Sequence, residues 1–403
     1  MSEKPNKIGV PRYAWVILAL GYLCGINGSL ILNKISPLVP DLMAAFDVNL
    51  GESGLLMSMY GLTGVLLALP SGLIIQRLGL KTAGMIAFAC IISGATLGAL
   101  SGSYGLLLGS RMLEGFGTGL ILILIPAAIA MWFPPEKSGT PIGIWSTAIP
   151  VGGFLTLTII PPLAEIIGWE GVWWISAGTS LLAMVAFWFL IRPAPAEDSR
   201  SAFIPNTPPS GLLDDMRTVV TKKSAWLLTL VWFGFGMVLT PIITFYPTFL
   251  ATGQGYGMAR AGFLVGLISV ANVPSAPLAG WVSDFIGSRK WVTLAGLLIL
   301  LPLSLLIFRA TGPMIPVAMI LMGLCTGMVT TTIFAAVPDA VGTPLLSGMG
   351  IALLSLGMSI TLVVAPPIFG ALVEKLGWAT AAYFFAPFIL IAMVAAFANK
   401  RVP

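Results

Sequence analysis

The sequence predicts an all-α membrane protein with twelve transmembrane helices, built as two six-helix bundles related by a pseudo-twofold axis. The first reason is composition: 57% of the 403 residues are hydrophobic, 9% are charged, and the mean hydropathy is +0.99. A soluble domain carries far more charge than this. The second reason is that apolar runs of about 18 residues or more, enough to cross a bilayer, recur along the whole chain. The third is that the second half repeats motifs of the first.

Each apolar run is expected to be a helix, because a segment in lipid must satisfy its own backbone hydrogen bonds. The first run follows a polar, basic start and continues too far for a cleaved signal peptide, so we predict a retained first helix. The three cysteines lie within apolar runs and predict no disulfide framework. The predicted spans are 13–40, 53–75, 82–100, 104–131, 140–163, 172–191, 225–250, 260–281, 291–309, 313–337, 345–372 and 379–398.

The longest connection, residues 193–223, is rich in Pro and Ser and carries charges of both signs. This composition is typical of a solvated linker. It divides the chain into an N-terminal bundle (1–192) and a C-terminal bundle (224–403). Fifteen Lys and Arg residues lie on the side of the termini and three on the other. The positive-inside rule therefore predicts cytoplasmic termini and a cytoplasmic linker, in a cell (inner) membrane.

Short motifs recur in the two halves at nearly one offset. Two bundles that each enter the membrane from the same side must be related by an axis along the membrane normal. The repeated motifs are GLIIQRLG (72–79) with GWVSDFIG (280–287) and GFGTG (115–119) with GLCTG (323–327), each 208 residues apart, and PPLAEIIGW (161–169) with PPIFGALVEKLGW (366–378).

These motifs resemble those of the major facilitator superfamily, and the resemblance covers essentially the whole chain. The family's loop between helices 2 and 3 reads roughly G-x-x-x-D-R-x-G-R-[RK]. The second copy keeps Gly280, Asp284, Gly287, Arg289 and Lys290, and the first keeps Gly72, Arg77, Gly79 and Lys81 but has Gln76 in place of the Asp. Arg111, Gly115 and Gly117 are similar to the family's R-x-x-x-G-x-G pattern in helix 4.

The resemblance implies that the two loop copies take part in gating. Glycines 72 and 280 are expected to let helices approach closely, and Gly79 and Gly287 to permit a tight turn. Asp284 is expected to cap a helix or to pair with a cationic loop residue of the other half in one state and release it in the other. Arg77 and Arg289 are candidate partners in such a gate, although Arg289 can also be only a positive-inside anchor. Gln76 brings no charge, so the first-half contact should be weaker.

Ionisable residues at membrane depth are costly and mark candidate sites. Lys34, Arg111 and Glu114 are clear cases, and Asp41 is borderline. Asn27, Lys34 and Asp41 are seven residues apart and should share one face of the first helix. We predict that Lys34 and Arg111 attract an anionic substrate in a cavity, with Asn27 beside them. Alternatively, Lys34 is a snorkelling or paired lysine, and Arg111 with Glu114 is an internal pair. Because the chain has no histidine, Glu114 and Asp41 are the candidate proton carriers.

In the resembling family, helices 1, 4, 7 and 10 line the cavity. The matching polar positions, with one on helix 2 that can reach the cavity, are Asn33, Tyr60, Tyr246 and Thr330. Threonines in membrane helices usually bond their own backbone, which is the alternative for Thr330. Trp173 and Trp174 are expected to be interface anchors.

We therefore predict a secondary transporter of a small organic or inorganic anion, coupled to protons, loosely like the cyanate and carboxylate permeases. It should work by alternating access, as a single chain in the lipid bilayer. The alternative is a drug/proton antiporter, but AIPVGG (148–153) departs from the G-P-x-x-G-G motif of such exporters. An enzyme is not expected, because there is no histidine and no cofactor motif. We expect no cofactor, no metal and no nucleic-acid partner.

Overall fold

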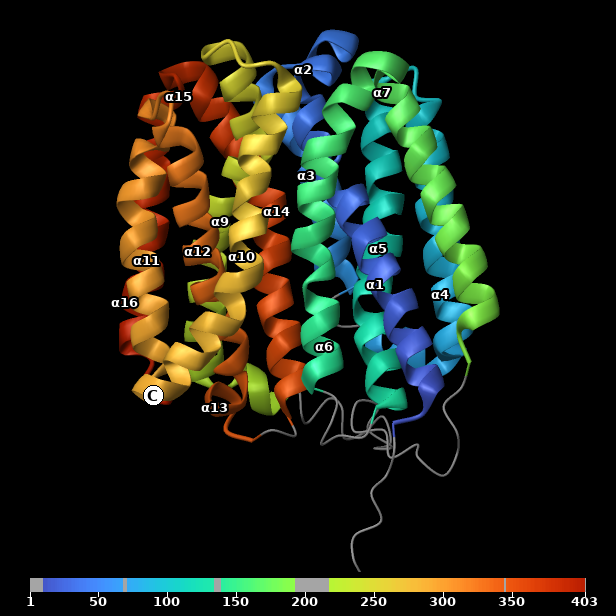
Figure 1. The fold of residues 1–403 in the computed structure, drawn as a ribbon, viewed down its shortest axis with the longest axis vertical. Coiled ribbons are helices and arrows are strands. Elements are labelled where there is room, and N and C mark those ends of the chain that lie inside the picture. Colours follow the sequence, from blue (N-terminus) through green and yellow to red (C-terminus); the bar gives the residue numbers. More distant parts are fainter. Residues whose placement is uncertain (1–9, 68–70, 134–138, 193–216, 344–345, 403) are drawn as a thin grey trace, which may run out of the picture.

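The computed structural model describes residues 10–67, 71–133, 139–192, 217–343 and 346–402, and its regular elements are all helical over these ranges (Figure 1). Most of the predicted linker, residues 193–216, lies outside the described residues. The helices run side by side, up to α7 on one side of Figure 1 and from α9 onward on the other. The helices up to α7 and those from α9 onward thus occupy different sides of the molecule, in agreement with two bundles. The exact boundaries of the bundles, at residues 192 and 224, stay a prediction.

The N-terminal helices follow the predicted spans with two refinements. The helices are α1 (Arg12–Asn33), α2 (Ile35–Phe46), α3 (Leu50–Leu67), α4 (Ser71–Ala99), α5 (Tyr104–Trp132), α6 (Gly139–Ser146) and α7 (Ala148–Leu190). The backbone turns inside α4 at Gly79 (φ 75°) and inside α7 at Gly168 (φ 74°), so each joins parts of two successive spans. Only glycine adopts this left-handed conformation without strain. By length and composition, the described residues contain 11 candidate spans, in which Gly139–Leu190 counts once although it covers two of the predicted spans, 140–163 and 172–191.

The first predicted span is broken at Lys34, between α1 and α2. Pro37 lies three residues further on and has no N–H to donate to the carbonyl of Asn33, which weakens the helix at that point. Lys34 itself keeps helical dihedral angles (φ −58°, ψ −24°), and Arg12–Phe46 counts as one candidate span.

The C-terminal half repeats the same plan. Its helices are α9 (Lys223–Gly253), α10 (Met258–Ile286), α11 (Arg289–Leu306), η2 (Ile307–Arg309), α12 (Met314–Ala335), α13 (Val337–Val341), α14 (Ser347–Leu376), α15 (Trp378–Ala381), η4 (Ala382–Phe384) and α16 (Phe385–Ala398). A cluster of aromatic rings in mutual contact, including Phe249, Phe308, Phe369 and Phe385, packs inside this half.

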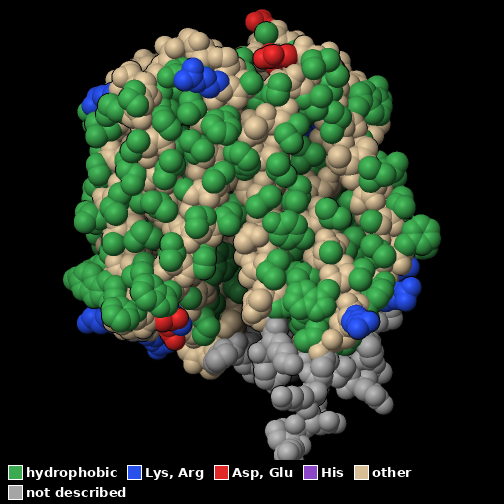
Figure 2. All heavy atoms as spheres, viewed as in Figure 1, with side chains coloured by type: hydrophobic (Ala, Val, Ile, Leu, Met, Phe, Trp, Pro, Cys, Tyr) green, Lys and Arg blue, Asp and Glu red, His purple; other side chains and the backbone are tan. Residues whose placement is uncertain are grey.

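We call the end of the molecule where the described chain begins and finishes the tail end, and the opposite end the distal end (Figure 1). In Figure 2 the charged side chains lie at the two ends: mainly basic ones at the tail end, and both acidic and basic ones at the distal end. The sides of the molecule between the two ends are covered with hydrophobic side chains in this view. A wide apolar belt between two polar ends is the surface of a protein that crosses a membrane many times.

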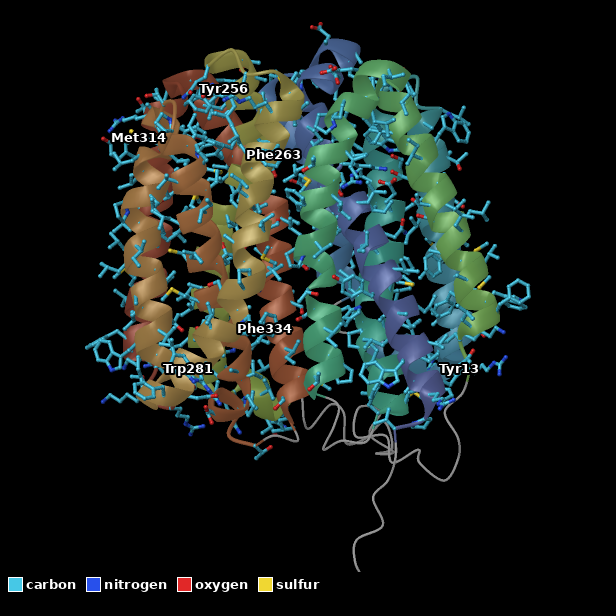
Figure 3. The ribbon with its side chains drawn as sticks, viewed as in Figure 1. Tyr13, Tyr256, Phe263, Trp281, Met314 and Phe334 are labelled. Carbon is cyan, nitrogen blue, oxygen red and sulfur yellow. The ribbon has the colours of Figure 1, made fainter. Side chains whose placement is uncertain are left out.

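The two halves meet through α3 packed on α14 and α7 packed on α10. A Cβ added at Gly54 of α3 would lie 2.6 Å from the nitrogen of Pro367, and one at Gly262 of α10 would lie 2.0 Å from the carbonyl of Leu157. Gly54 and Gly262 are 208 residues apart, the offset of the sequence repeat. Phe263, labelled in Figure 3, packs against Phe154 of α7 with ring centroids 6.1 Å apart. The interface thus has the internal symmetry that the repeat predicts.

Candidate functional site

Three buried ionisable side chains form one cluster inside the N-terminal half. The Lys34 Nζ lies 2.6 Å from Glu114 Oε1, and the Arg111 Nη1 lies 2.5 Å from Glu114 Oε2. All three side chains are 0% exposed. With every group ionised, the cluster holds two positive charges and one negative charge. We refer to Lys34, Arg111 and Glu114 as the ion cluster.

Aromatic rings and backbone carbonyls complete the surroundings of the ion cluster. The Arg111 Nη1 also donates to the carbonyl of Ile31 at 2.9 Å, and its guanidinium lies 4.9 Å from the ring centre of Tyr60. The Lys34 Nζ lies 4.3 Å from the ring centre of Trp173. Such contacts between a cation and a ring are worth most where water is excluded. The buried Trp173 ring therefore packs against the ion cluster, which corrects the expectation that Trp173 is an interface anchor. Trp174 is exposed.

Glycines of α5 allow the neighbouring helices to close around the cluster. A Cβ at Gly115 would lie 2.5 Å from the carbonyl of Tyr60 on α3, and a Cβ at Gly117 would lie 2.2 Å from the carbonyl of Ala87 on α4. Gly94 of α4 in turn faces the backbone of Glu114. The R-x-x-x-G-x-G pattern noted in the sequence therefore has a direct physical meaning: its glycines permit the approach that buries its arginine.

Lys34 and Arg111 were expected either to attract an anion in a cavity or to form internal ion pairs, and in this conformation the pairs are present. Lys34 and Arg111 are fully buried and share one carboxylate, so neither is free to meet a ligand in this conformation. Arg111 Nη2 is a buried nitrogen of the ion cluster for which the described residues offer no hydrogen-bond partner. Sequence spacing pointed to Arg111 with Glu114, at i and i+3, but not to the pairing of Lys34 with Glu114 across 80 residues.

The face expected to hold Asn27, Lys34 and Asp41 is present for Asn27 and Lys34, which contact Ser180 and Trp173, two residues of α7 that are also seven apart. Asn27 is buried and donates through Nδ2 to Ser180 Oγ at 3.0 Å, inside the N-terminal half. Asp41 lies beyond the break in the helix and is exposed at the distal end. Asp41 lies seven residues beyond Lys34, about 10 Å further along the helix, which brings it to the end of the molecule. Asp41 is thus separate from the ion cluster, and Glu114 is the carboxylate within it.

Asn33 belongs to a polar group at the interface of the two halves. A Cβ placed on Gly153 would lie 3.3 Å from Ser269 Oγ, 3.7 Å from Ser29 Oγ and 3.8 Å from Asn33 Nδ2. Ser29 and Asn33 come from α1 and Ser269 from α10, so both halves contribute. Asn33 and Ser269 are half-buried. We refer to Ser29, Asn33 and Ser269 as the interface polar group; Asn33 directly precedes Lys34 of the ion cluster in the chain.

Two other predicted contacts lie elsewhere. Tyr246 is fully buried among the aromatic rings of the C-terminal half and donates to the carbonyl of Ile307 at 3.0 Å. Tyr246 therefore packs inside the C-terminal half, away from the ion cluster. Thr330 is half-buried and bonds the carbonyl of Thr326, one turn back, as the alternative for membrane threonines expected.

The residues predicted to form the gate lie at the tail end. Gly79 and Gly287 have φ of 75° and 71°, which the tight turns require. Gly280 is not tightly packed, since a Cβ there would lie 3.7 Å from Thr331. The Asp284 side chain is exposed and has no partner among the described residues, so the expected bond across the halves is absent in this conformation.

Arg289 has a partner that the sequence did not indicate. It forms an ion pair with Asp339 at 2.6 Å within the C-terminal half. Arg77 is exposed, Gly72 lies in α4, and the side chain of Gln76 lies outside the described ones. Figure 2 shows the surface hollowed between the two halves toward the tail end. The halves are therefore apart where the gate was expected and joined near the distal end.

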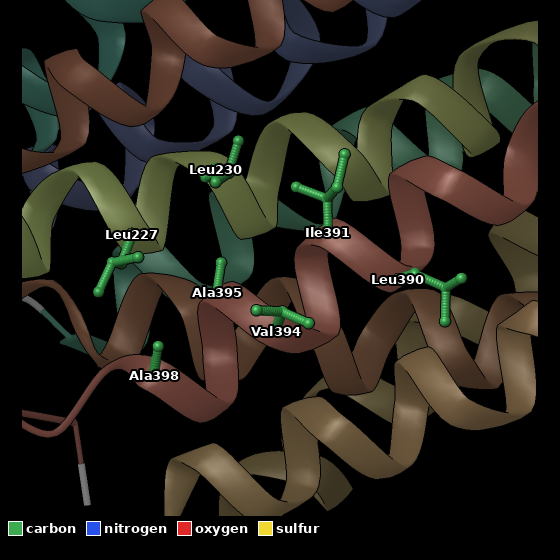
Figure 4. Close-up of a pocket in the computed structure, with 7 residues that line it drawn as sticks. All are labelled: Leu227, Leu230, Leu390, Ile391, Val394, Ala395 and Ala398. Atoms are coloured by element: carbon green, nitrogen blue, oxygen red, sulfur yellow. The ribbon is translucent and has the colours of Figure 1, made fainter.

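An apolar groove on the outer surface offers no chemistry for a polar ligand. It lies between α9 and α16 and is lined by Leu227, Leu230, Leu390, Ile391, Val394, Ala395 and Ala398 (Figure 4). Aliphatic side chains on the outside of a spanning bundle are the surface that lipid tails cover. The ion cluster and the interface polar group remain the candidate site.

Comparison with known proteins supports a transporter. A family model described as the Major Facilitator Superfamily matches residues 18–344 and, in a second match, 259–403. A "Hexuronate transporter" of Bacillus subtilis (strain 168) is 22% identical over 274 residues, 67% of this chain and 64% of the relative, so the match spans less than two thirds of that protein. A "Probable nitrate transporter NarT" of Staphylococcus aureus (strain JH9) is 22% identical over 323 residues, 80% of each chain.

Solved structures agree with the fold. A bacterial homolog of the human lysosomal transporter Spinster, in an inward-facing and unoccupied conformation, superposes with a TM-score of 0.82 at 16% identity, over 98% of each chain. A second structure described as a bacterial homolog of Spinster, in an inward-facing and occupied conformation, gives a TM-score of 0.79, also at 16% identity and 98% of each chain. At this identity the likeness concerns the fold alone.

Proposed function

Because the chain belongs to the major facilitator superfamily, we propose that it moves a small anion across the membrane together with protons, by alternating access. It is a multi-pass membrane protein whose relatives are named as transporters of hexuronate and nitrate. The anionic substrate class is supported by those two names and by the excess positive charge of the ion cluster. We further propose that the tail end faces the cytoplasm, on the strength of its basic residues.

The observation that carries the proposal is a net positive charge hidden from water. Lys34 and Arg111 share the single carboxylate of Glu114, and all three are 0% exposed. A charge inside a low-dielectric protein acts over a longer distance than one in water. The cluster therefore gives the adjoining interior of the molecule a positive potential, which favours anions over cations.

The shared carboxylate also supplies a route to proton coupling. When Glu114 takes up a proton, the cluster gains one unit of positive charge and an anion nearby is bound more tightly. By reciprocity, a bound anion makes Glu114 easier to protonate. Proton and anion then favour each other on the same protein, which is the linkage that symport requires.

The interface polar group is the proposed place for the anion. Ser29, Asn33 and Ser269 come from both halves and surround Gly153. The Ser29 hydroxyl donates to the carbonyl of Ile149 and the Asn33 amide donates to Ser29, so a bound anion would take over these donors. Asn33 directly precedes Lys34 in the chain, which ties this group to the ion cluster. An anion held here would touch both halves, and its binding would therefore respond to their relative movement.

Uptake into proteoliposomes tests the proposal. Replacing Lys34 or Arg111 with glutamine removes the excess charge, and we expect uptake of nitrate or a hexuronate to fall at least tenfold in each variant. Lys375→Gln, which removes an exposed cation at the distal end, is the control and should keep its uptake. Equal uptake in wild type, Lys34→Gln and Arg111→Gln would refute the role of the ion cluster.

Ligand-induced thermal stabilisation of the purified protein tests the substrate class separately. The proposal expects small anions to raise the melting temperature, with a smaller rise in Lys34→Gln. Stabilisation by lipophilic cations alone would favour a drug exporter instead.

A further inference from the structure

Two prolines in the C-terminal half leave backbone carbonyls without their helical donors. A proline has no N–H, so the carbonyl four residues before it loses its normal partner. Pro247 in α9 has this effect on Ile243, and Pro367 in α14 has it on Val363. A carbonyl left bare inside a membrane protein is unfavourable and is normally bonded by some other group.

Serines of the other half supply the missing hydrogen bonds. Ser36 Oγ, on α2, donates to the carbonyl of Ile243 at 2.5 Å, with the carbonyl of Thr244 at 3.0 Å. Ser58 Oγ, on α3, donates to the carbonyl of Val363 at 2.6 Å. In both cases the donor belongs to the N-terminal half and the acceptor to the C-terminal half. Each serine is only 2% exposed, so water does not share these bonds.

Both bonds depend on the conformation of the whole molecule, since they exist only while the halves are together at the distal end. Ser58 already lies 3.4 Å from the carbonyl of Gly54 in its own helix, which would receive its proton once the halves part. The carbonyl of Val363 would then be left to water. Closure of the distal end therefore replaces water with a serine donor at each carbonyl, an exchange that favours the closed state by the net value of one hydrogen bond.

The symmetry-related contact between α7 and α10 provides an internal comparison. Pro162 corresponds to Pro367 in the repeated Pro-Pro pair and takes the helical donor from the carbonyl of Thr158, but the residue of α10 near Thr158 is Gly266, which has no side chain to donate. Gly266 stands at the position equivalent to Ser58, 208 residues later. A proline at the interface thus does not by itself create a side-chain bond; the serine must be present too.

We propose that Ser36 with Ile243, and Ser58 with Val363, are two latches that hold the distal end closed and set the balance between the two states of the transport cycle. This inference rests on the alternating access proposed above. Each latch needs both its serine and its proline. Restoring an N–H in place of either proline would satisfy the carbonyl within its helix and make the serine dispensable.

Distances between spin labels on the protein in nanodiscs test the latches. In a background without Cys24, Cys90 and Cys325, one label pair at Gly102→Cys and Thr311→Cys reports the distal end. A second pair at Leu78→Cys and Phe285→Cys reports the tail end. All four positions are exposed, and a side chain at Gly102 meets nothing within 4 Å.

We expect Ser36→Ala and Ser58→Ala each to raise the ratio of distal-open to distal-closed molecules about two- to tenfold, the net effect of one hydrogen bond. Ser304→Ala is the matched control, because Ser304 is fully buried and bonds the carbonyl of Leu301 within its own helix. It should leave both distances unchanged. Pro367→Ala should itself favour opening, and Ser58→Ala should add nothing in that background; Pro247 and Ser36 should behave likewise.

The two ways of failing are distinguishable. Suppose that the label distances show both distal-open and distal-closed molecules. If Ser58→Ala then has the same effect with and without Pro367, or no more effect than Ser304→Ala, the latches are refuted. Alternating access would stand in either case. If each label pair keeps one fixed distance in every variant and at every anion concentration, alternating access is refuted and the latches with it.

Discussion

At the scale of single residues, the ion cluster is held by one carboxylate between two cations. Burying charges removes their hydration, and this is tolerated only when the partners compensate one another. Glu114 compensates both Lys34 and Arg111, whereas each cation compensates only Glu114. The three residues are therefore unequal. Removal of the Glu114 carboxylate leaves two buried positive charges without a partner. Removal of Lys34 leaves Arg111 and Glu114 as a neutral pair.

This inequality predicts the stability of two variants. Glu114→Gln should lower the free energy of unfolding by about 3–5 kcal/mol, the usual loss when one partner of a buried ion pair is removed. Lys34→Met should lower it by clearly less, because Arg111 and Glu114 still neutralise each other. Thermal unfolding in detergent micelles measures the order, with the exposed Glu165→Gln as control. A larger loss in Lys34→Met than in Glu114→Gln would contradict the assignment.

At the scale of helices, small residues allow neighbouring helices to approach closely, and this approach brings the residues of the ion cluster together. The cluster forms because α3 and α4 both reach the backbone of α5 at glycines. Lipid gives little hydrophobic drive for helix association, so van der Waals contact at such positions carries more weight than in soluble proteins. The glycine pattern is visible in the sequence, but the neighbours of each glycine are not.

Two glycines of α5 offer a matched comparison. Gly115→Ala places a methyl group 2.4 Å from Thr63 Oγ1 and 2.5 Å from the carbonyl of Tyr60, so α3 must shift away. We expect a fall in melting temperature equivalent to about 1–3 kcal/mol. Gly109→Ala on the same helix meets nothing within 4 Å and should be neutral or stabilising by up to about 1 kcal/mol. Similar melting temperatures for the two variants would show that α3 and α5 are not in tight contact.

At the scale of the whole molecule, the halves are joined near the distal end and parted toward the tail end. Three hydrogen bonds join the halves on the distal side, and their donors are Ser36, Ser58 and the Leu50 N–H. The Leu50 N–H donates to Glu374 Oε1 at 2.5 Å. At the tail end, Arg289 bonds Asp339 of its own half instead of reaching across. The exposed carboxylate of Asp284 fits a gate that is released in this conformation.

The sequence predicted the spans and the repeat because hydropathy and motif spacing are local properties. The twelve-helix transporter fold followed from them and is confirmed by the family match and the solved structures. The pairing of Lys34 with Glu114 joins residues 80 apart, and that of Arg289 with Asp339 joins residues 50 apart. Such pairs depend on the rotation and register of packed helices. The latches depend on the same register, so neither motif nor composition pointed to Ser36 or Ser58.

The central claim is that an anion and a proton cross together, and one measurement tests it most directly. Proteoliposomes loaded with a pH-sensitive dye, with the membrane potential clamped, are given an inward gradient of nitrate or a hexuronate at equal pH on both sides. The account predicts that the lumen becomes acidic as the anion enters, and that Lys34→Gln shows neither uptake nor acidification. Uptake of the anion with no change in luminal pH, or no uptake of either anion by the wild type, would contradict it.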